Sequence, residues 1–166
     1  LPIQYSNSFK SGSELQVYKN HASYNDQSYT PPKITIKDID IKGIIGKGSF
    51  GKIYCVNVKG TDIVYAMKSY NKKEFLSSSL VRFLFVEKKI MVNFDHPFLV
   101  KLYYAFQNKD KLFILMDYCE KKDLTKQVLI LDEIQIKILA CELVLAIKAL
   151  HDREMIHRDI KPDNVF

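Results

Sequence analysis

The chain has 166 residues, of which 47% are apolar and 27% charged, with six glycines and five prolines. This is the composition of a globular domain with a hydrophobic core, and it excludes collagen-like, coiled-coil and low-complexity proteins. Every apolar run is broken by a charge well before the ~18 residues that a membrane span requires, and the amino end has no signal-peptide pattern. We therefore expect no membrane span and an intracellular, cytoplasmic location.

The net charge is +6, and residues 1–40 contribute nothing to it because they hold four Lys and four acidic residues. The basic part of the chain, residues 41–166, could bind nucleic acid, an acidic surface or a phosphorylated small molecule. No predicted helix carries a row of Lys or Arg, and no basic stretch is interleaved with aromatic residues. We therefore expect no nucleic-acid partner.

Three cysteines, Cys55, Cys119 and Cys141, are scattered along the chain without a CxxC pair. An odd number at such spacings provides neither a disulfide framework nor a zinc site, and it favours a reducing compartment.

The amino-terminal stretch, residues 1–32, is rich in Ser, Asn and Tyr and ends in Pro31-Pro32. It shows no sustained hydrophobic period, so we expect a flexible N-terminal segment over residues 1–36. The alternative is that its tyrosines form a ligand or modification segment.

The next part of the chain has the alternating, β-branched pattern of strands. Tight turns separate the first three runs, and a polar turn at 107–110 separates the last two, which predicts an antiparallel sheet. Between them, residues 72–94 have the spacing of an amphipathic helix that His96-Pro97 ends. The five predicted strands are Ile34–Ile45, Ile53–Val58, Ile63–Lys68, Val100–Phe106 and Lys111–Met116.

The last part of the chain is predicted to be helical. Residues 121–131 form a short helix or loop, and Asp132 with Gln135 has the form of a capping box that opens an apolar helix over 136–150. This helix is apolar on most of its circumference. We expect much of that surface to lack a partner here, so that the isolated chain aggregates or requires another protein.

A glycine-rich turn, Gly46-Lys47-Gly48-Ser49-Phe50-Gly51, lies between the first two long strands. Because a strand and not a helix follows it, the context excludes a dinucleotide-binding fold. Glycines let backbone N–H groups approach an anion closely, as a flap over phosphates requires. The alternative is a glycine-rich hairpin without a ligand.

Lys68 follows Ala66 and Met67 on a predicted strand, so that Ala66 and Lys68 share one face. A lysine that faces a site requires an anion, either a phosphate or a carboxylate, and Glu87 on the following helix is a candidate carboxylate. The alternatives are an edge lysine and a glutamate on a solvated helix face.

The segment His157-Arg158-Asp159-Ile160-Lys161-Pro162-Asp163-Asn164 follows the apolar helix and is dense in polar groups. Asp159 could accept a hydroxyl proton, Lys161 could neutralise a transferring phosphate, and Asn164 could offer a carbonyl oxygen to Mg²⁺. A polar loop of this density without a function would be a coincidence.

These motifs, in this order, resemble a eukaryotic protein kinase domain: a glycine-rich loop, a strand lysine, a helix glutamate and a His-Arg-Asp catalytic loop. The stretch from His96 to Phe106 is similar to the AGC group, and Lys161 two places after Asp159 resembles the serine/threonine-specific form. The resemblance implies an α+β fold with a small antiparallel five-stranded lobe and one helix over 37–119. Residues 120–166 would begin an incomplete helical second lobe.

The resemblance also implies a kinase that uses ATP and Mg²⁺ to phosphorylate Ser or Thr of a protein substrate and that an upstream kinase activates. It implies roles for individual residues in this reaction. Lys68, held by Glu87, would bind the α- and β-phosphates. Asp159 and Lys161 would be catalytic, and Asn164 would bind the metal. The implied nucleotide-binding set is Ile45, Gly46, Lys47, Gly48, Ser49, Phe50, Gly51, Ile53, Ala66, Lys68, Met116, Asp117, Cys119, Asp123 and Phe166.

Within that set, Met116 would be the gatekeeper, and Asp117 to Cys119 the hinge whose backbone bonds the adenine. Asp123 would meet the ribose, and Phe166 would be the floor of the adenine site.

The resemblance stops at Phe166, before any Asp-Phe-Gly, activation segment or Ala-Pro-Glu. We therefore expect this polypeptide alone to be inactive, and its full-length parent to be an active serine/threonine kinase. The alternative is a short, non-catalytic nucleotide-binding or partner-binding module.

Overall fold

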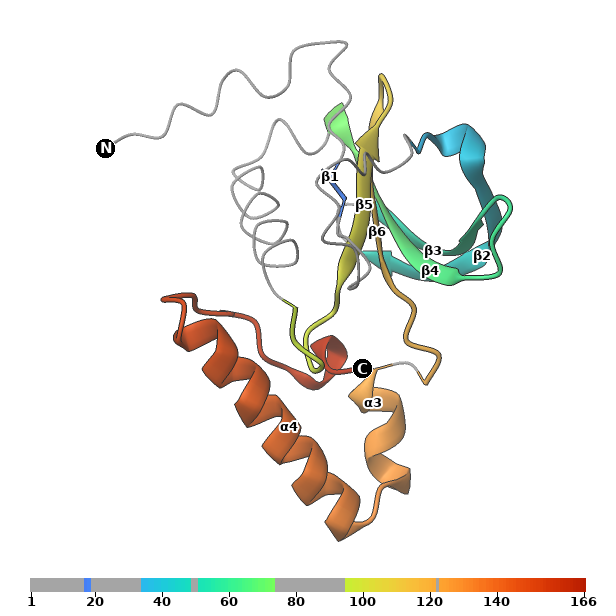
Figure 1. Cartoon of the computed structure of the whole chain (residues 1–166). Helices are drawn as coiled ribbons and strands as arrows, with labels where there is room; N and C mark the ends of the chain where they lie inside the picture. The colour runs from blue at the N-terminus through green and yellow to red at the C-terminus, as the bar shows by residue number, and fades with distance from the viewer. Residues whose placement is uncertain (1–16, 19–33, 49–50, 74–94, 122) are drawn as a thin grey trace. The chain divides into compact units, whose positions relative to one another are not determined.

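A computed structural model describes residues 17–18, 34–48, 51–73, 95–121 and 123–166 of the chain (Figure 1). Most of the predicted flexible segment, Ser49 and Phe50 of the glycine-rich turn, and the predicted helix from residue 74 onward lie outside the described residues. The described residues form two compact units. One includes residues 34–73 and 102–118, and the other includes residues 95–101 and 119–166.

The first unit is an antiparallel sheet with the strand order β1-β5-β6-β4-β3-β2 (Figure 1). The five predicted strands are confirmed, and a two-residue strand, β1, adds to the β5 edge from within the segment predicted to be flexible. The strands are β1 (Val17–Tyr18), β2 (Ile39–Gly48), β3 (Gly51–Val58), β4 (Val64–Asn71), β5 (Leu102–Gln107) and β6 (Lys111–Asp117).

The described part of this unit includes core residues that precede the predicted boundary at residue 37. Ile34, which was predicted to start the first strand, is 6% exposed and belongs to the hydrophobic core. A short 3₁₀ turn, Ile36–Asp38, replaces the start of that strand because Thr35 and Asp38 cap it reciprocally through side-chain and backbone hydrogen bonds. The strand itself therefore starts at Ile39.

Alternation along the strands divides their side chains between two faces of the sheet. One face carries the hydrophobic core, in which Met67 and Leu115 are almost fully buried and the Phe106 and Phe113 rings stack at 5.2 Å. The opposite face carries Ala66, Lys68 and their cross-strand partners. The core residues are Ile34, Ile39, Val56, Tyr65, Met67, Phe106, Phe113 and Leu115.

The second unit contains α3 (Leu124–Gln127), a 3₁₀ turn (Val128–Ile130), α4 (Glu133–His151) and a last 3₁₀ turn (Pro162–Asn164). The predicted capping box is confirmed: the Gln135 backbone N–H donates to Asp132 Oδ1 at 2.8 Å, and the Asp132 N–H donates to Gln135 Oε1 at 3.0 Å. Among the described helices, none has both the length and the apolar content that crossing a membrane requires.

The apolar surface of α4 is largely exposed, as the sequence predicted. Only Ala146 and Leu150 are buried on this helix. Ile134, Val144 and Leu145 are 70%, 63% and 49% exposed. Since apolar side chains in water are unfavourable, α4 offers a surface that favours association.

Candidate functional site

Four residues of the predicted nucleotide site lie on one face of the sheet. In the strand register, Ile53 of β3 lies opposite Lys68 of β4, and Ala66 of β4 lies opposite Met116 of β6. Cross-strand partners in an antiparallel sheet point to the same side, and Ala66 and Lys68 are two residues apart. The sheet therefore brings an aliphatic side chain, a methyl group, an ammonium group and a thioether together on the face opposite the core.

Lys68 lies in the middle of this face, between β3 and β6, and is partly buried. Its Nζ lies 5.3 Å from the centre of the Tyr70 ring on the same strand, within the range of a cation–π interaction. Its position in a central strand excludes the alternative that it is an edge lysine. Glu87, its predicted carboxylate partner, lies outside the described residues.

The glycine-rich turn is the end of the β2–β3 hairpin. Gly48 lies opposite Gly51 in the register and Lys47 opposite Lys52, so two exposed lysines stand beside the turn. Ile45 lies at a register shift between Ile44 and Gly46 and is 47% exposed. Ser49 and Phe50 of the predicted set lie outside the described residues.

The two ends of this turn have different steric surroundings. A Cβ at Gly51 would overlap the carbonyl oxygen of Ser69 and lie 2.9 Å from its carbonyl carbon, because β3 and β4 approach closely there. A Cβ at Gly46 would meet only the Ile53 side chain, at 3.4 Å. The fold itself requires glycine at 51, whereas it does not at 46.

The predicted hinge begins at the end of β6. Met116 is partly buried, and the carboxylate of Asp117 accepts a hydrogen bond from the Tyr103 hydroxyl at 2.8 Å. Cys119 is also partly buried, and the division between the two units falls between Tyr118 and Cys119. The chain passes from one unit to the other at the predicted hinge.

The predicted catalytic loop follows α4, and its backbone brings three polar side chains together. Arg158 has a left-handed φ of 70°, as has Glu154 at 59° in the preceding turn, and this conformation is unfavourable for a non-glycine residue. Pro162, whose ring favours the first position of a helical turn, then starts the last 3₁₀ turn, which carries Asn164 back to Asp159.

Asp159 accepts hydrogen bonds from both of the other predicted groups. Lys161 Nζ lies 3.0 Å and Asn164 Nδ2 lies 2.8 Å from Asp159 Oδ2, and Asn164 Nδ2 also lies 2.7 Å from the Asp159 carbonyl oxygen. The Asp159 side chain is 63% exposed. Exposed ion pairs contribute little to stability, so this cluster is poorly explained as a structural device.

The electrostatics keep Asp159 ionised. The hydrogen bond from Lys161, and next that from Asn164, lower the pKa of the Asp159 carboxyl below its ordinary value of 3.8. The Asn164 side-chain amide donates its N–H to Asp159, so the oxygen of that amide points away from the Asp159 carboxylate. A carboxylate and an amide oxygen are the kinds of hard donor that Mg²⁺ prefers, so Asp159 and Asn164 suit this ion by donor type. Among the described residues, no group of three or more His, Cys, Asp or Glu side chains could hold a metal ion.

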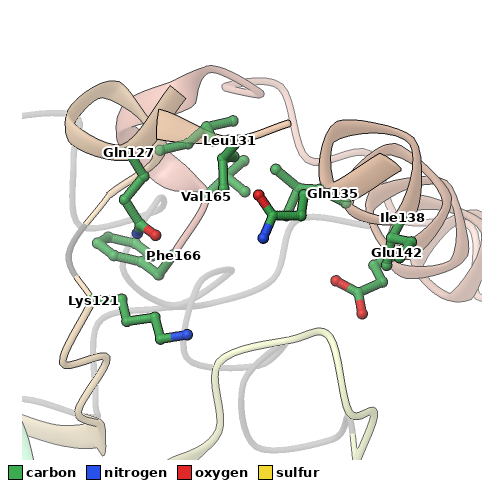
Figure 2. A pocket seen from close by; sticks show the side chains of 10 residues that line it. Lys121, Gln127, Leu131, Gln135, Ile138, Glu142, Val165 and Phe166 are labelled. Carbon is green, nitrogen blue, oxygen red and sulfur yellow. The ribbon is translucent and has the colours of Figure 1, made fainter. Parts of the chain in front are cut away.

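Two further predicted residues lie in the second unit. Asp123, at the start of α3, accepts hydrogen bonds from Lys126 and Thr125, and these bonds lower its pKa to about 2. Its carboxylate is therefore engaged locally. Phe166 is 59% exposed and lines a hollow of about 240 Å³ with Val165 and residues of α3 and α4 (Figure 2).

The structure thus brings seven of the predicted residues together in two groups. Ile53, Ala66, Lys68 and Met116 share one face of the sheet, and Asp159, Lys161 and Asn164 meet in the loop after α4, whereas Asp123 and Phe166 belong to neither group. Sequence reasoning missed Tyr103, which holds Asp117. The available signal was the pair Tyr103-Tyr104, because two successive large aromatic residues interrupt the alternation of a strand.

Comparison with known proteins identifies the family of the chain. The protein kinase domain family matches residues 39–166. Human serine/threonine-protein kinase 32B is 40% identical over 121 residues, which are 71% of this chain and 29% of that protein. A probable serine/threonine-protein kinase of Dictyostelium discoideum is 38% identical over 70% of this chain and 26% of its own length. Serine/threonine-protein kinase sgk-1 of Caenorhabditis elegans is 36% identical over 71% of this chain and 26% of its own length.

The chain spans less than a third of the length of these relatives. The family match includes the sheet face with Lys68 and the loop with Asp159, and it covers most of the sequence. The chain belongs to the protein kinase domain family.

Proposed function

We propose that the protein carrying this chain is a serine/threonine kinase that transfers the γ-phosphate of ATP to a hydroxyl of a protein substrate. The observation that carries the proposal is the exposed cluster in which Lys161 and Asn164 both bond to the Asp159 carboxylate. The names of the relatives, which are serine/threonine-protein kinases, support the same activity.

In the proposed reaction, the hydroxyl oxygen of the substrate Ser or Thr attacks the γ-phosphorus of ATP. A new O–P bond forms, the bond from the γ-phosphorus to the β,γ-bridging oxygen breaks, and ADP leaves. Asp159 accepts the hydroxyl proton, and its carboxyl, whose pKa lies below 3.8, is in the ionised form that can do so at neutral pH. Lys161 offsets negative charge on the phosphoryl group in transfer.

The nucleotide is proposed to lie against the sheet face of Ile53, Ala66 and Met116, with its phosphates near the Lys68 ammonium group. Apolar side chains around one charged group are what an adenine next to a triphosphate requires. Mg²⁺, which Asn164 would help to hold, would supply positive charge to the phosphate oxygens.

The finer features of this proposal are ATP and Mg²⁺ as the nucleotide and metal, an AGC-like kinase, an intracellular location and activation by an upstream kinase. They rest on the family resemblance. A non-catalytic nucleotide-binding module would share the sheet face but would not need Asp159 as a base. The effect of removing the Asp159 carboxylate on phosphoryl transfer therefore distinguishes a kinase from such a module.

The test uses Lys68→Met and Asp159→Asn in the natural protein that carries this chain. We expect each to lower phosphoryl transfer by on the order of 100-fold or more, since each removes a charge or a base from the reaction. Asp159→Asn should leave ATP affinity unchanged. Lys111→Met, at an exposed position of β6, is the control and should retain activity. Full activity of Asp159→Asn would contradict the proposal.

A further inference from the structure

The pairing of β5 with β6 contains an irregularity at Tyr103. Leu102 lies opposite Met116 and Tyr104 lies opposite Leu115, so successive residues of β6 face two residues of β5 that are not successive. Tyr103 is the extra residue of a β-bulge. Bulges redirect side chains and occur often beside active sites.

The bulge places two successive tyrosines on the same side of the sheet. The rings of Tyr103 and Tyr104 both contact the ring of Tyr65 edge-on, with centroids at 5.1 and 6.2 Å. In a regular strand these neighbours would point to opposite faces. Tyr65 is 3% exposed and belongs to the hydrophobic core, so the Tyr103 ring is held by a buried partner.

The redirected Tyr103 reaches the start of the predicted hinge. Its hydroxyl donates to Asp117 Oδ1 at 2.8 Å in a partly buried position. Asp117 lies opposite Tyr65 in the β4–β6 register and directly follows Met116. The carboxylate is thus held on the core side of the sheet, at the point where β6 ends.

We propose that Tyr103 is a positioning residue that fixes the hinge backbone through Asp117 and so sets the affinity for the nucleotide. The inference rests on the proposed function and on the expectation, from the family resemblance, that the backbone of residues 117–119 bonds the adenine. A hinge whose first residue is held in one conformation presents its N–H and C=O groups without loss of backbone freedom on binding. Tyr103 itself does not touch the nucleotide in this account.

The test variant is Tyr103→Phe, which keeps the ring against Tyr65 and removes only the hydroxyl. Tyr104→Phe removes a hydroxyl from the adjacent ring and is the matched control. Asp117→Asn retains an acceptor oxygen and should behave more like the unmodified protein than Asp117→Ala does.

Two measurements are made on the natural protein that carries this chain. The first is hydrogen exchange of the Tyr118 and Cys119 amides without nucleotide, which we expect to quicken about tenfold in Tyr103→Phe, as for a lost hydrogen bond to a charged group. The second is the kinetics with ATP, where we expect KM to rise several-fold while kcat changes little. Tyr104→Phe should move neither.

Unchanged exchange at Tyr118 and Cys119 would overturn the inference. Exchange that quickens equally in β4 and β6 would also overturn it, because the hydroxyl would then stabilise the sheet as a whole. Quicker exchange in the hinge with an unchanged KM would refute the effect on nucleotide affinity. If the unmodified protein binds no ATP, the proposed function fails, and the exchange rates still decide whether Tyr103 orders the hinge.

Discussion

Gly46 and Gly51 belong to the same turn but are glycine for different reasons. At Gly51 a side chain would collide with the Ser69 backbone of the neighbouring strand, so the fold excludes one. At Gly46 the nearest atom is in the flexible Ile53 side chain. The proposed approach of a phosphate gives a reason for glycine at position 46, whereas packing against β4 is sufficient to require glycine at position 51. The sequence motif could not separate these two reasons because the distance between β3 and β4 is a tertiary property.

Gly51→Ala and Gly46→Ala are therefore expected to differ in their effects on stability and on ATP binding. Gly51→Ala should lower the free energy of unfolding by about 1–3 kcal/mol, since backbone must move to remove the overlap. Gly46→Ala should change stability by less than about 1 kcal/mol but weaken ATP binding. Thermal unfolding and ATP titration of both variants provide the check. Equal stability of the two variants would contradict the steric account of Gly51.

The ionisation of Asp159 offers a second test at the scale of one residue. Its pKa is lowered chiefly by the Lys161 hydrogen bond, so Lys161→Met should raise the pKa of Asp159 toward 3.8. A lowered pKa means that the Asp159 interactions favour the folded state above pH 3.8 and that this contribution is lost as pH falls through the lowered value. Titration of the Asp159 carboxyl carbon by NMR measures the shift. A pKa that stays the same or falls would contradict the contact.

Among the elements, those with a strong local pattern were predicted well. Strand-like runs bounded by turns predicted β3, β4 and β6, and the Asp132–Gln135 pair predicted the start of α4. The 3₁₀ turn at Ile36–Asp38, strand β1 and the bulge at Tyr103 were not predicted. Each depends on a contact that local propensity does not describe. The 3₁₀ turn depends on the capping pair of Thr35 and Asp38, and β1 depends on pairing with the distant strand β5. The bulge depends on the register of β5 against β6.

The capping box of α4 makes a quantitative prediction at this scale. Asp132→Ala removes the acceptor of the Gln135 N–H and should destabilise the second unit by about 1 kcal/mol. Lys137→Ala, which breaks the exposed pair with Glu133 on the same helix, should change stability by at most about 0.5 kcal/mol. Chemical denaturation followed by circular dichroism compares them. An effect of Lys137→Ala as large as that of Asp132→Ala would contradict the capping argument.

For the whole molecule, the exposed apolar surface of α4 is the feature with the largest consequence. Ile134, Val144 and Leu145 are each about half exposed or more, and an apolar surface of this kind favours association in water. We expect the isolated chain to self-associate. Lysine substitutions at Ile134 and Val144 should reduce this association without loss of helix content, as sedimentation and circular dichroism would show. An unmodified chain that sediments as a monomer at micromolar concentration would contradict the expectation.

The predicted site residues are divided between the two units, so the proposed function is also argued at this scale. Local spacing in the sequence was sufficient to find Lys68 and the loop from His157 to Asn164. Alternation within one strand also placed Ala66 on the face of Lys68. The strand register then showed that Ile53 and Met116 share this face, which local spacing between distant strands cannot establish.

The most direct test of the central claim, that the Lys68 ammonium group meets the phosphates of a nucleotide, is labelling with an acyl phosphate of ATP. A lysine amine beside the phosphates attacks the acyl carbon, forms a stable amide and releases ATP. We expect peptide mass analysis to find the acyl group on Lys68, and excess ATP to prevent it. Labelling confined to exposed lysines such as Lys47 and Lys52, and unaffected by ATP, would contradict the account.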